Sequence, residues 1–175
     1  MNNLTACEGV IMTELLPNAV GEDSGQEWVE LYNGSNDVIF LGDCKILVNG
    51  TEYGFNPDQF LEVGEYKHFT DFIDGTSVKT ITLKNTDVNT ISFGRKFAGI
   101  TFVALQTVQY ENAPEGQSWA RFDDGWRWFQ RLVAHGALAL FGPLIDLVKL
   151  SRVKRRRPAR GVVVAGGTGD RQRRT

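Results

Sequence analysis

Between residues 9 and 110, apolar and polar residues alternate in short runs, and turn-forming residues interrupt these runs about every ten positions. A period of two places successive side chains on opposite faces of an extended strand, whereas an amphipathic helix needs a period near 3.6. The pattern therefore predicts about eight or nine short strands and no helix, as in a β-sandwich or barrel. The expected strands are residues 9–16, 27–33, 37–41, 44–48, 51–55, 65–72, 78–83, 89–95 and 100–110.

The second expected strand shows the alternation clearly. Val29 and Leu31 should point one way, and Trp28, Glu30 and Tyr32 should point the other way. We expect Val29 and Leu31 to lie in the core, because they are the aliphatic set.

Two Asn-Gly dipeptides follow expected strands, Asn33-Gly34 and Asn49-Gly50. This dipeptide readily adopts positive φ, which tight hairpin turns require. We therefore expect a turn at each of them.

Two stretches carry a family resemblance. Residues 10–46, VIMTELLPNAVGEDSGQEWVELYNGSNDVIFLGDCKI, join an apolar strand ending in Glu to a Pro-Asn turn and the motif E-W-V-E-L-x-N. Residues 110–128, YENAPEGQSWARFDDGWRW, lead from a strand ending in Tyr through A-P-x-G-x-S to an aromatic residue, an Arg and a D-G turn. Both stretches resemble the lamin-tail domain family in its bacterial form, and together they frame residues 9–128.

The resemblance implies an immunoglobulin-like β-sandwich and a binding or structural role without catalysis. Members of this family occur beside secreted or surface-associated domains in bacteria, and in the nuclear lamins of animals. The resemblance therefore implies an extracellular or cell-surface location in a larger protein. Residues 1–8 form an N-terminal extension that lacks the basic and apolar segments of a signal peptide.

The chain departs from the family pattern at Cys44. The family places a Trp after L-x-G, so a smaller residue here needs compensation by neighbours such as Phe40 or Trp28, or it leaves a cavity costing a few kcal/mol. The spacing of Cys7 and Cys44 fits no metal motif and says nothing about pairing. We expect both cysteines to be ordinary packed thiols.

The formal net charge of −2 conceals a strong segregation of charge. Residues 1–128 carry 19 acidic against 8 basic side chains, a net charge of −11, whereas residues 129–175 carry 2 against 11, a net charge of +9. All ten asparagines precede Trp128. The composition therefore predicts a body that ends near Trp128 and a separate basic tail, residues 129–175, whose pattern does not decide between helix and disorder.

The preferred interpretation of the tail is a shifted reading frame. Residues 129–133 can be encoded as TTC CAA CGC CTG GTG, and a shift of two bases turns this into CCA ACG CCT GGT, or Pro-Thr-Pro-Gly. A segment of that kind closes the domain in the family. The interpretation predicts a one-base insertion or deletion near the Trp128 codon.

Other interpretations give the tail a function. Residues 132–150 are apolar enough for a short membrane anchor followed by a basic stop, although Asp146, Pro143 and His135 oppose insertion. Residues 154–157 form a short basic run that is a weak signal for nucleic acid. The glycine-rich stretch at residues 161–171 resembles a phosphate loop but leaves no room for the helix that such a loop opens, so we expect no cofactor.

The candidates for catalysis are few. The chain has two histidines, His68 in an expected strand and His135 in the tail, and we expect His68 to be a half-exposed strand residue instead of a base. Glu14 and Glu30 can neighbour each other on paired strands, either as a functional carboxylate pair, as solvated edge charges or as a pair satisfied by Arg121. We expect no catalytic residues.

Two acidic loops invite a calcium interpretation, residues 22–24 and 123–125. Hard cations take several oxygen ligands from flexible turns. Neither loop has EF-hand spacing, and turn formation by Asp and Gly explains both. We expect no metal site.

The closing stretch concentrates aromatic residues around two arginines, residue types that are enriched at interaction hot spots. The candidate interaction surface comprises Trp119, Arg121, Trp126, Arg127 and Trp128. The alternative is packing at the end of the sandwich, with an arginine stacked on an indole. The expected partner is a protein or a cell-surface polymer.

Overall fold

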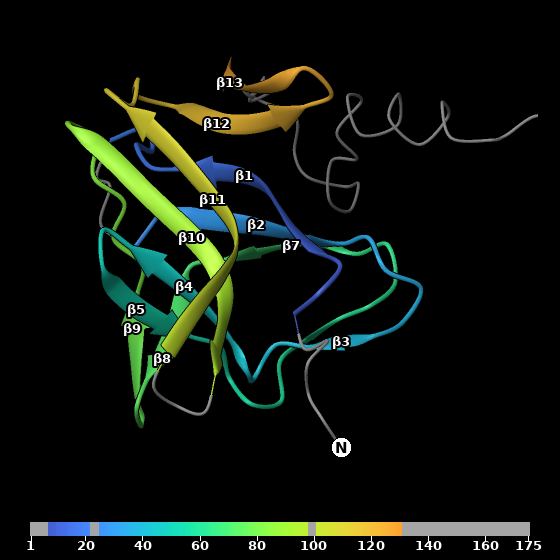
Figure 1. Ribbon diagram of the computed structural model, residues 1–175. Coiled ribbons are helices and arrows are strands. Elements are labelled where there is room, and N and C mark those ends of the chain that lie inside the picture. The colour runs from blue at the N-terminus through green and yellow to red at the C-terminus, as the bar shows by residue number, and fades with distance from the viewer. Residues whose placement is uncertain (1–6, 22–24, 98–100, 131–175) are drawn as a thin grey trace, which may run out of the picture. The chain divides into compact units, whose positions relative to one another are not determined.

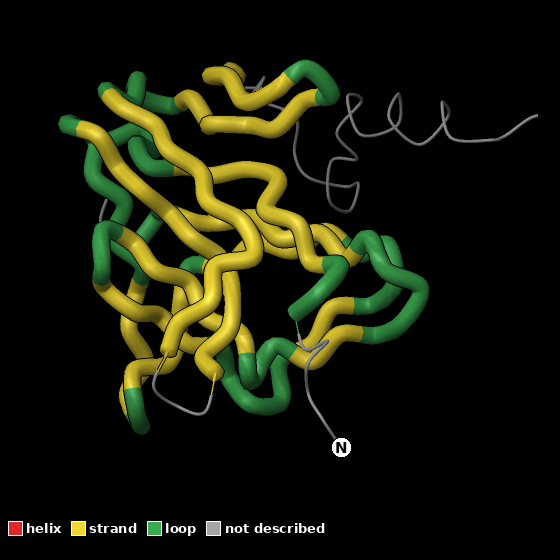
Figure 2. Tube along the Cα trace, viewed as in Figure 1, coloured by secondary structure: helices red, strands yellow, loops and turns green. Residues whose placement is uncertain are grey.

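The computed structural model describes residues 7–21, 25–97 and 101–130, and these residues form an all-β sandwich (Figure 1). The predicted fold class is therefore confirmed. Strands joined by turns and loops account for this part of the chain (Figure 2). The strands are β1 (Val10–Leu16), β2 (Trp28–Asn33), β3 (Ile39–Phe40), β4 (Cys44–Val48), β5 (Thr51–Gly54), β6 (Phe60–Leu61), β7 (Tyr66–Phe69), β8 (Asp71–Asp74), β9 (Ser77–Thr80), β10 (Val88–Phe97), β11 (Thr101–Glu111), β12 (Gln117–Phe122) and β13 (Gly125–Gln130).

The strands form two main antiparallel sheets. One has five strands in the order β13-β12-β1-β2-β7, and the other has six in the order β11-β10-β4-β5-β8-β9. Strands β3 and β6 form a separate ribbon. The single strand expected at residues 65–72 is instead two strands, β7 and β8, which belong to different sheets, so the chain crosses between the layers at Thr70.

The core lies between the two main sheets and confirms the predicted register of β2. Val29 and Leu31 are fully buried. They pack in one cluster with buried residues of the facing sheet, among them Ile46, Ile91 and Phe93. The opposite face of β2 is also largely buried, since Glu30 is 1% exposed.

Strand β1 takes its backbone partners from both sheets. It pairs with β2 along its length, but with β12 only at Glu14 and Leu15. Earlier in the strand, the Gln106 side chain of β11 takes the place of a neighbouring strand: its Oε1 accepts from Met12 N at 3.0 Å, and its Nε2 donates to Val10 O at 2.7 Å. One amide therefore links the two layers.

A β-bulge in the β10–β11 pair sets the position of Gln106. Phe93 pairs with Gln106 and Gly94 with Ala104, which leaves Leu105 as the extra residue. Gly94 is required at the bulge, because a Cβ there would collide with the Val103 carbonyl.

The two Asn-Gly dipeptides behave differently. Asn49 and Gly50 have φ values of 50° and 86° and close the β4–β5 hairpin as predicted. Asn33 and Gly34 do not adopt positive φ, so the expected reason for that turn is wrong. Asn33 instead acts through its side chain, accepting from Ser35 N at 2.9 Å and donating to Leu61 O at 3.0 Å. The turn is thereby tied to the β3–β6 ribbon.

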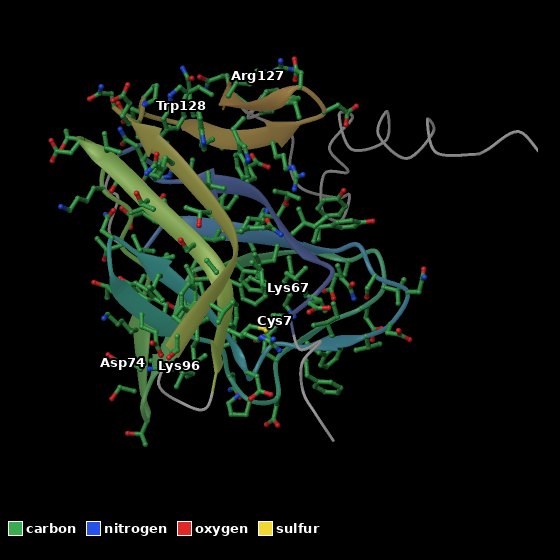
Figure 3. The ribbon with its side chains drawn as sticks, in the orientation of Figure 1. Cys7, Lys67, Asp74, Lys96, Arg127 and Trp128 are labelled. Atoms are coloured by element: carbon green, nitrogen blue, oxygen red, sulfur yellow. A yellow bond between two sulfur atoms is a disulfide. The ribbon has the colours of Figure 1, made fainter. Side chains whose placement is uncertain are left out.

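Cys7 and Cys44 form a disulfide, so the expectation of two packed thiols is wrong (Figure 3). Their Cα atoms lie 5.7 Å apart and both residues are fully buried. The expectation that Phe40 or Trp28 fills the space left by the smaller Cys44 is also wrong. Phe40 is 64% exposed, and Trp28 stacks on His68 on the face of β2 opposite Val29. Cys7 fills the space instead, from a turn that sequence spacing could not place.

The expected boundary after Trp128 falls within β13, whose last pair joins Gln130 to Gln117. Residues 131–175 lie outside the described residues, and with them the proposed frame shift, the anchor at residues 132–150 and the basic run. Within residues 7–21, 25–97 and 101–130, no helix has the length and apolarity that crossing a membrane requires.

Replacing Leu31 with Asp places an unpaired charge in the core. This costs several kcal/mol against a total stability of about 5 to 15 kcal/mol, so we expect Leu31→Asp to lose cooperative unfolding. Circular dichroism during heating measures this. Val78→Asp is the control, because Val78 is 70% exposed, and its melting should match that of the parent. A normal melt for Leu31→Asp would show that the register is wrong.

Removing the disulfide frees a loop with a sequence separation of 37 residues. We expect the double variant Cys7→Ser, Cys44→Ser to lose about 3 to 4 kcal/mol of unfolding free energy, as a cross-link over a loop of that size provides. Urea unfolding with and without dithiothreitol measures this. The reductant should lower the midpoint of the parent and leave that of the variant unchanged, and equal midpoints for oxidised parent and variant would contradict the expectation.

Candidate functional site

The hairpin β12–β13 carries the predicted interaction residues and divides them between its two faces. Trp119 pairs with Trp128 and Arg121 with Trp126, so these four residues share one face. Arg127 pairs with Ala120 and lies on the other face. The structure therefore brings together four of the five predicted residues.

The three tryptophans of the hairpin are half-buried and pack against the core. Arg127 lies on the other face, where its guanidinium covers the Phe122 ring at 3.8 Å and pairs with Asp124 at 3.0 Å (Figure 3). The predicted packing at the end of the sandwich is thus present, but this arginine stacks on a phenylalanine and not on an indole. Asp124, from one proposed calcium loop, is engaged in this ion pair; residues 22–24, the other loop, lie outside the described residues.

Trp119 and Trp128 meet a third ring from the other sheet. Their ring centroids are 4.9 Å apart, and Trp128 contacts the Tyr110 ring of β11 edge-on at 5.8 Å. The contact brings the hairpin against the end of the β10–β11 pair. It creates an aromatic step between the two sheets.

A groove of about 640 Å³ runs along this step. We call it the aromatic groove. Its lining comprises Val88, Gln109, Tyr110, Glu111, Asn112, Pro114, Trp119 and Trp128. Its volume falls within the range of small-molecule sites in proteins.

Sequence reasoning found Trp119 and Trp128 but missed the part of the groove that β11 and the following turn supply. A signal was present, because Tyr110 lies at the end of β11, one residue before its last residue. It could not be used without knowing that β11 and β13 approach each other across the sandwich.

Tyr110 forms a fixed wall of the groove. It is 3% exposed, and its hydroxyl donates to Lys84 O at 2.9 Å. Burial raises the pKa of Tyr110 above its ordinary value, and the negative charge of Glu27 raises it further. The side chain therefore stays neutral and oriented through the physiological range.

The rim of the groove offers both hydrogen-bond acceptors and donors. Gln109 donates one Nε2 hydrogen to Thr90 Oγ1 at 3.0 Å, which leaves its second N–H and its carbonyl oxygen for a ligand. Glu111, the last residue of β11, and Asn112, the first residue after it, are exposed. The carboxylate can only accept, while the Asn112 amide can donate or accept.

A cluster of hydrogen-bonded polar side chains crosses the five-stranded sheet, away from the groove. Glu14 and Glu30 are cross-strand neighbours as predicted, but both are buried, so the interpretation as solvated edge charges is wrong. Ser118 Oγ donates to Glu14 at 2.5 Å, and Thr13 Oγ1 donates to Glu30 at 2.6 Å. His68 Nε2 lies 2.8 Å from the second oxygen of Glu30.

These contacts suit a structural role. Buried carboxylates are costly unless they are hydrogen-bonded, and each bond here joins two different strands. The prediction that His68 is a half-exposed strand residue is confirmed: its side chain is 40% exposed, and its ring stacks on Trp28 with 4.2 Å between centroids. Within the described part of the chain, no three His, Cys, Asp or Glu side chains gather in a way that could hold a metal.

The chain matches no protein-family model, no curated protein and no solved structure.

The raised pKa of Tyr110 predicts a loss of stability at alkaline pH. Folding favours the neutral form of Tyr110, because its pKa is higher in the folded state than in the unfolded state. Its contribution to the free energy of unfolding is therefore intact below pH 10 and is lost as the pH rises beyond 10. At pH 11 we expect ionisation of Tyr110 to lower the parent's free energy of unfolding by about 1.4 kcal/mol. Tyr110→Phe has no phenol at this position and should not show this loss. Urea unfolding of both proteins at pH 8 and pH 11 measures the difference, and parallel losses would contradict it.

Proposed function

We propose that this chain is a non-catalytic binding or structural module of the lamin-tail type, part of a larger secreted or cell-surface protein, and that it binds its partner at the aromatic groove. The observation that carries the proposal is the step formed by Tyr110, Trp119 and Trp128. Aromatic residues are enriched where proteins bind partners, because they bury a large area at low entropic cost. The partner is a protein or a cell-surface polymer.

The disulfide supports an extracytoplasmic location. Cys7 and Cys44 are bonded and fully buried. Disulfides form and persist mainly in oxidising compartments, and small secreted domains rely on them for stability.

The contacts of His68 and Ser118 support a role without catalysis. A serine nucleophile must be accessible to a substrate, but Ser118 is fully buried and donates to the buried Glu14, and His68 is held by Glu30 and Trp28. These groups are used to join strands.

The charge of the body favours a partner other than nucleic acid. Residues 1–128 carry a net charge of −11, which repels a phosphate backbone. The alternative of a membrane-tethered module depends on residues 132–150, which lie outside the described residues.

Retention on a bacterial envelope polymer tests the proposal. The fluorescently labelled full chain is mixed with purified bacterial sacculi, which are washed, and the bound fraction is measured. We expect the sacculi to retain the parent and to bind Trp128→Ala at least about tenfold more weakly, because this variant removes the indole at the centre of the groove.

Trp126→Ala is the matched control. Trp126 belongs to the same strand and packs against the same core, but it does not line the groove. Its retention should follow that of the parent when melting curves show both variants to be folded. Equal retention of the parent and both variants, or none for any of them, would contradict binding to the envelope through this groove.

A further inference from the structure

We propose that the outward face of the β3–β6 ribbon is a second interaction surface, and that it docks a basic segment of a partner protein in which an arginine lies between apolar side chains. The ribbon lies away from the β12–β13 hairpin, which carries the aromatic groove (Figure 1). The inference therefore goes beyond the proposed function and does not depend on it.

The ribbon is apolar on both faces. Strands β3 and β6 pair Ile39 with Leu61 and Phe40 with Phe60. Leu61 is fully buried, and Ile39 is partly buried against the core. The other pair points outward: Phe40 is 64% exposed and Phe60 is 39% exposed, with 6.0 Å between their ring centroids. These two phenylalanines are therefore not needed to cover the core.

Two valines enlarge this exposed face. Val38 directly precedes β3 and is 42% exposed, and Val63 follows β6 and is 53% exposed. We call Val38, Phe40, Phe60 and Val63 the ribbon patch. It holds four of the nine large apolar side chains that are exposed in the described part of the chain. Single exposed apolar residues are common on proteins, whereas a group of them with a polar rim marks an interaction site.

The ribbon patch is held in place before a partner arrives. Asn33 Nδ2 donates to Leu61 O of β6 at 3.0 Å. Just after β3, Leu41 N donates to Gln59 O at 2.8 Å, and N of the disulfide-bonded Cys44 donates to Leu41 O at 2.8 Å. A surface that is already ordered loses less conformational entropy when it binds.

The rim of the ribbon patch is acidic. Residues 37–43 and 58–65, which contain the ribbon and its flanks, carry five acidic side chains and no basic one. Lys67 of β7 adds one cation, 6.0 Å from the Phe60 ring, and leaves the local charge negative. Charge complementarity therefore favours a cationic partner.

An arginine uses both properties of the ribbon patch. A guanidinium group stacks on aromatic rings and also pairs with carboxylates through two parallel hydrogen bonds. Phe40 offers the more exposed ring, and Glu62, two residues after Phe60, follows the period of two that places it on the same outward face. Apolar neighbours of that arginine would cover Val38 and Val63.

The same charge disfavours the other occupants of an exposed apolar face. A second copy of this chain would bring two sets of five carboxylates together. Anionic lipid headgroups and a nucleic-acid backbone would also meet repulsion. A basic protein segment is the occupant that both the apolar area and the rim favour.

Fluorescence anisotropy of a labelled octapeptide of alternating arginine and valine, titrated with the full chain, tests the proposal. We expect saturable binding, and none for the octapeptide of alternating glutamate and valine. Phe40→Leu keeps an apolar side chain but removes the ring, so it should weaken binding about threefold or more. Phe40→Tyr keeps the ring and should bind as the parent does.

A pair of double variants separates local recognition from the overall attraction of opposite charges. Asp58→Asn with Glu62→Gln removes two exposed carboxylates of the rim and should weaken binding about threefold or more. The matched control is Asp74→Asn with Asp87→Asn, which changes the net charge equally at exposed positions of β8 and directly before β10. Its binding should stay close to that of the parent.

Five results would overturn the proposal. They are no saturable binding by the folded parent, binding that Phe40→Leu leaves intact, equal weakening by both double variants, a dimer in sedimentation equilibrium that Phe40→Leu abolishes, and Phe40-dependent retention on vesicles of phosphatidylcholine and phosphatidylglycerol in place of the peptide. Trp128→Ala should bind the peptide as the parent does. Loss of peptide binding therefore counts against the ribbon patch alone, and loss of sacculus binding counts against the groove alone.

Discussion

The backbone of β1 is the part of the domain on which the other elements depend. A strand inside a sheet must satisfy its N–H and C=O groups on both sides, and β1 does this with β2 on one side and with two different partners on the other. Gln106 serves the residues around Met12, and β12 serves Glu14 and Leu15. Because β12 joins only the second half of β1, the β12–β13 hairpin lies toward one end of the sandwich, where Trp128 meets Tyr110 of the facing sheet.

The buried polar groups fix this arrangement as firmly as the apolar core does. Glu14 receives a bond from β12, and Glu30 receives one from β1 and approaches His68 of β7. A slip of one residue in any of these strand pairs would leave a carboxylate buried without its partner, which costs more than a lost apolar contact. The apolar core on one face of the five-stranded sheet and the buried polar groups on the other therefore both fix the strand register. This register sets the pairing of Trp119 with Trp128.

Alternation along the chain was enough to predict the fold class and the core face of β2, because a period of two directly reports which side chains share a face. It placed Val29 and Leu31 correctly but said nothing about what covers Glu30 on the other side. The same rule applied to β12 and β13 would have separated Arg127 from Trp128, since adjacent residues of a strand point in opposite directions. Composition alone groups Arg127 with Trp128, because it carries no information about which face of a strand a residue occupies.

Features that depend on contacts between distant segments could not be predicted. The division between β7 and β8 follows from a change of sheet at Thr70, not from any break in the local pattern. The Cys7–Cys44 bond depends on where the first turn lies relative to β4. The aromatic groove combines β11 with a hairpin whose position is set through Gln106 and β1, so only its tryptophans could be identified from the sequence.

The most direct test of binding at the aromatic groove follows the indole N–H groups of the four tryptophans by proton–nitrogen NMR during addition of soluble fragments of bacterial sacculi. We expect the Trp119 and Trp128 signals to shift progressively and to saturate together. Those of Trp28, on the outer face of the five-stranded sheet, and of Trp126, outside the groove, should stay in place. Shifts centred on Trp28 or Trp126, or unchanged signals from all four indoles, would contradict the assignment of the groove as the binding site.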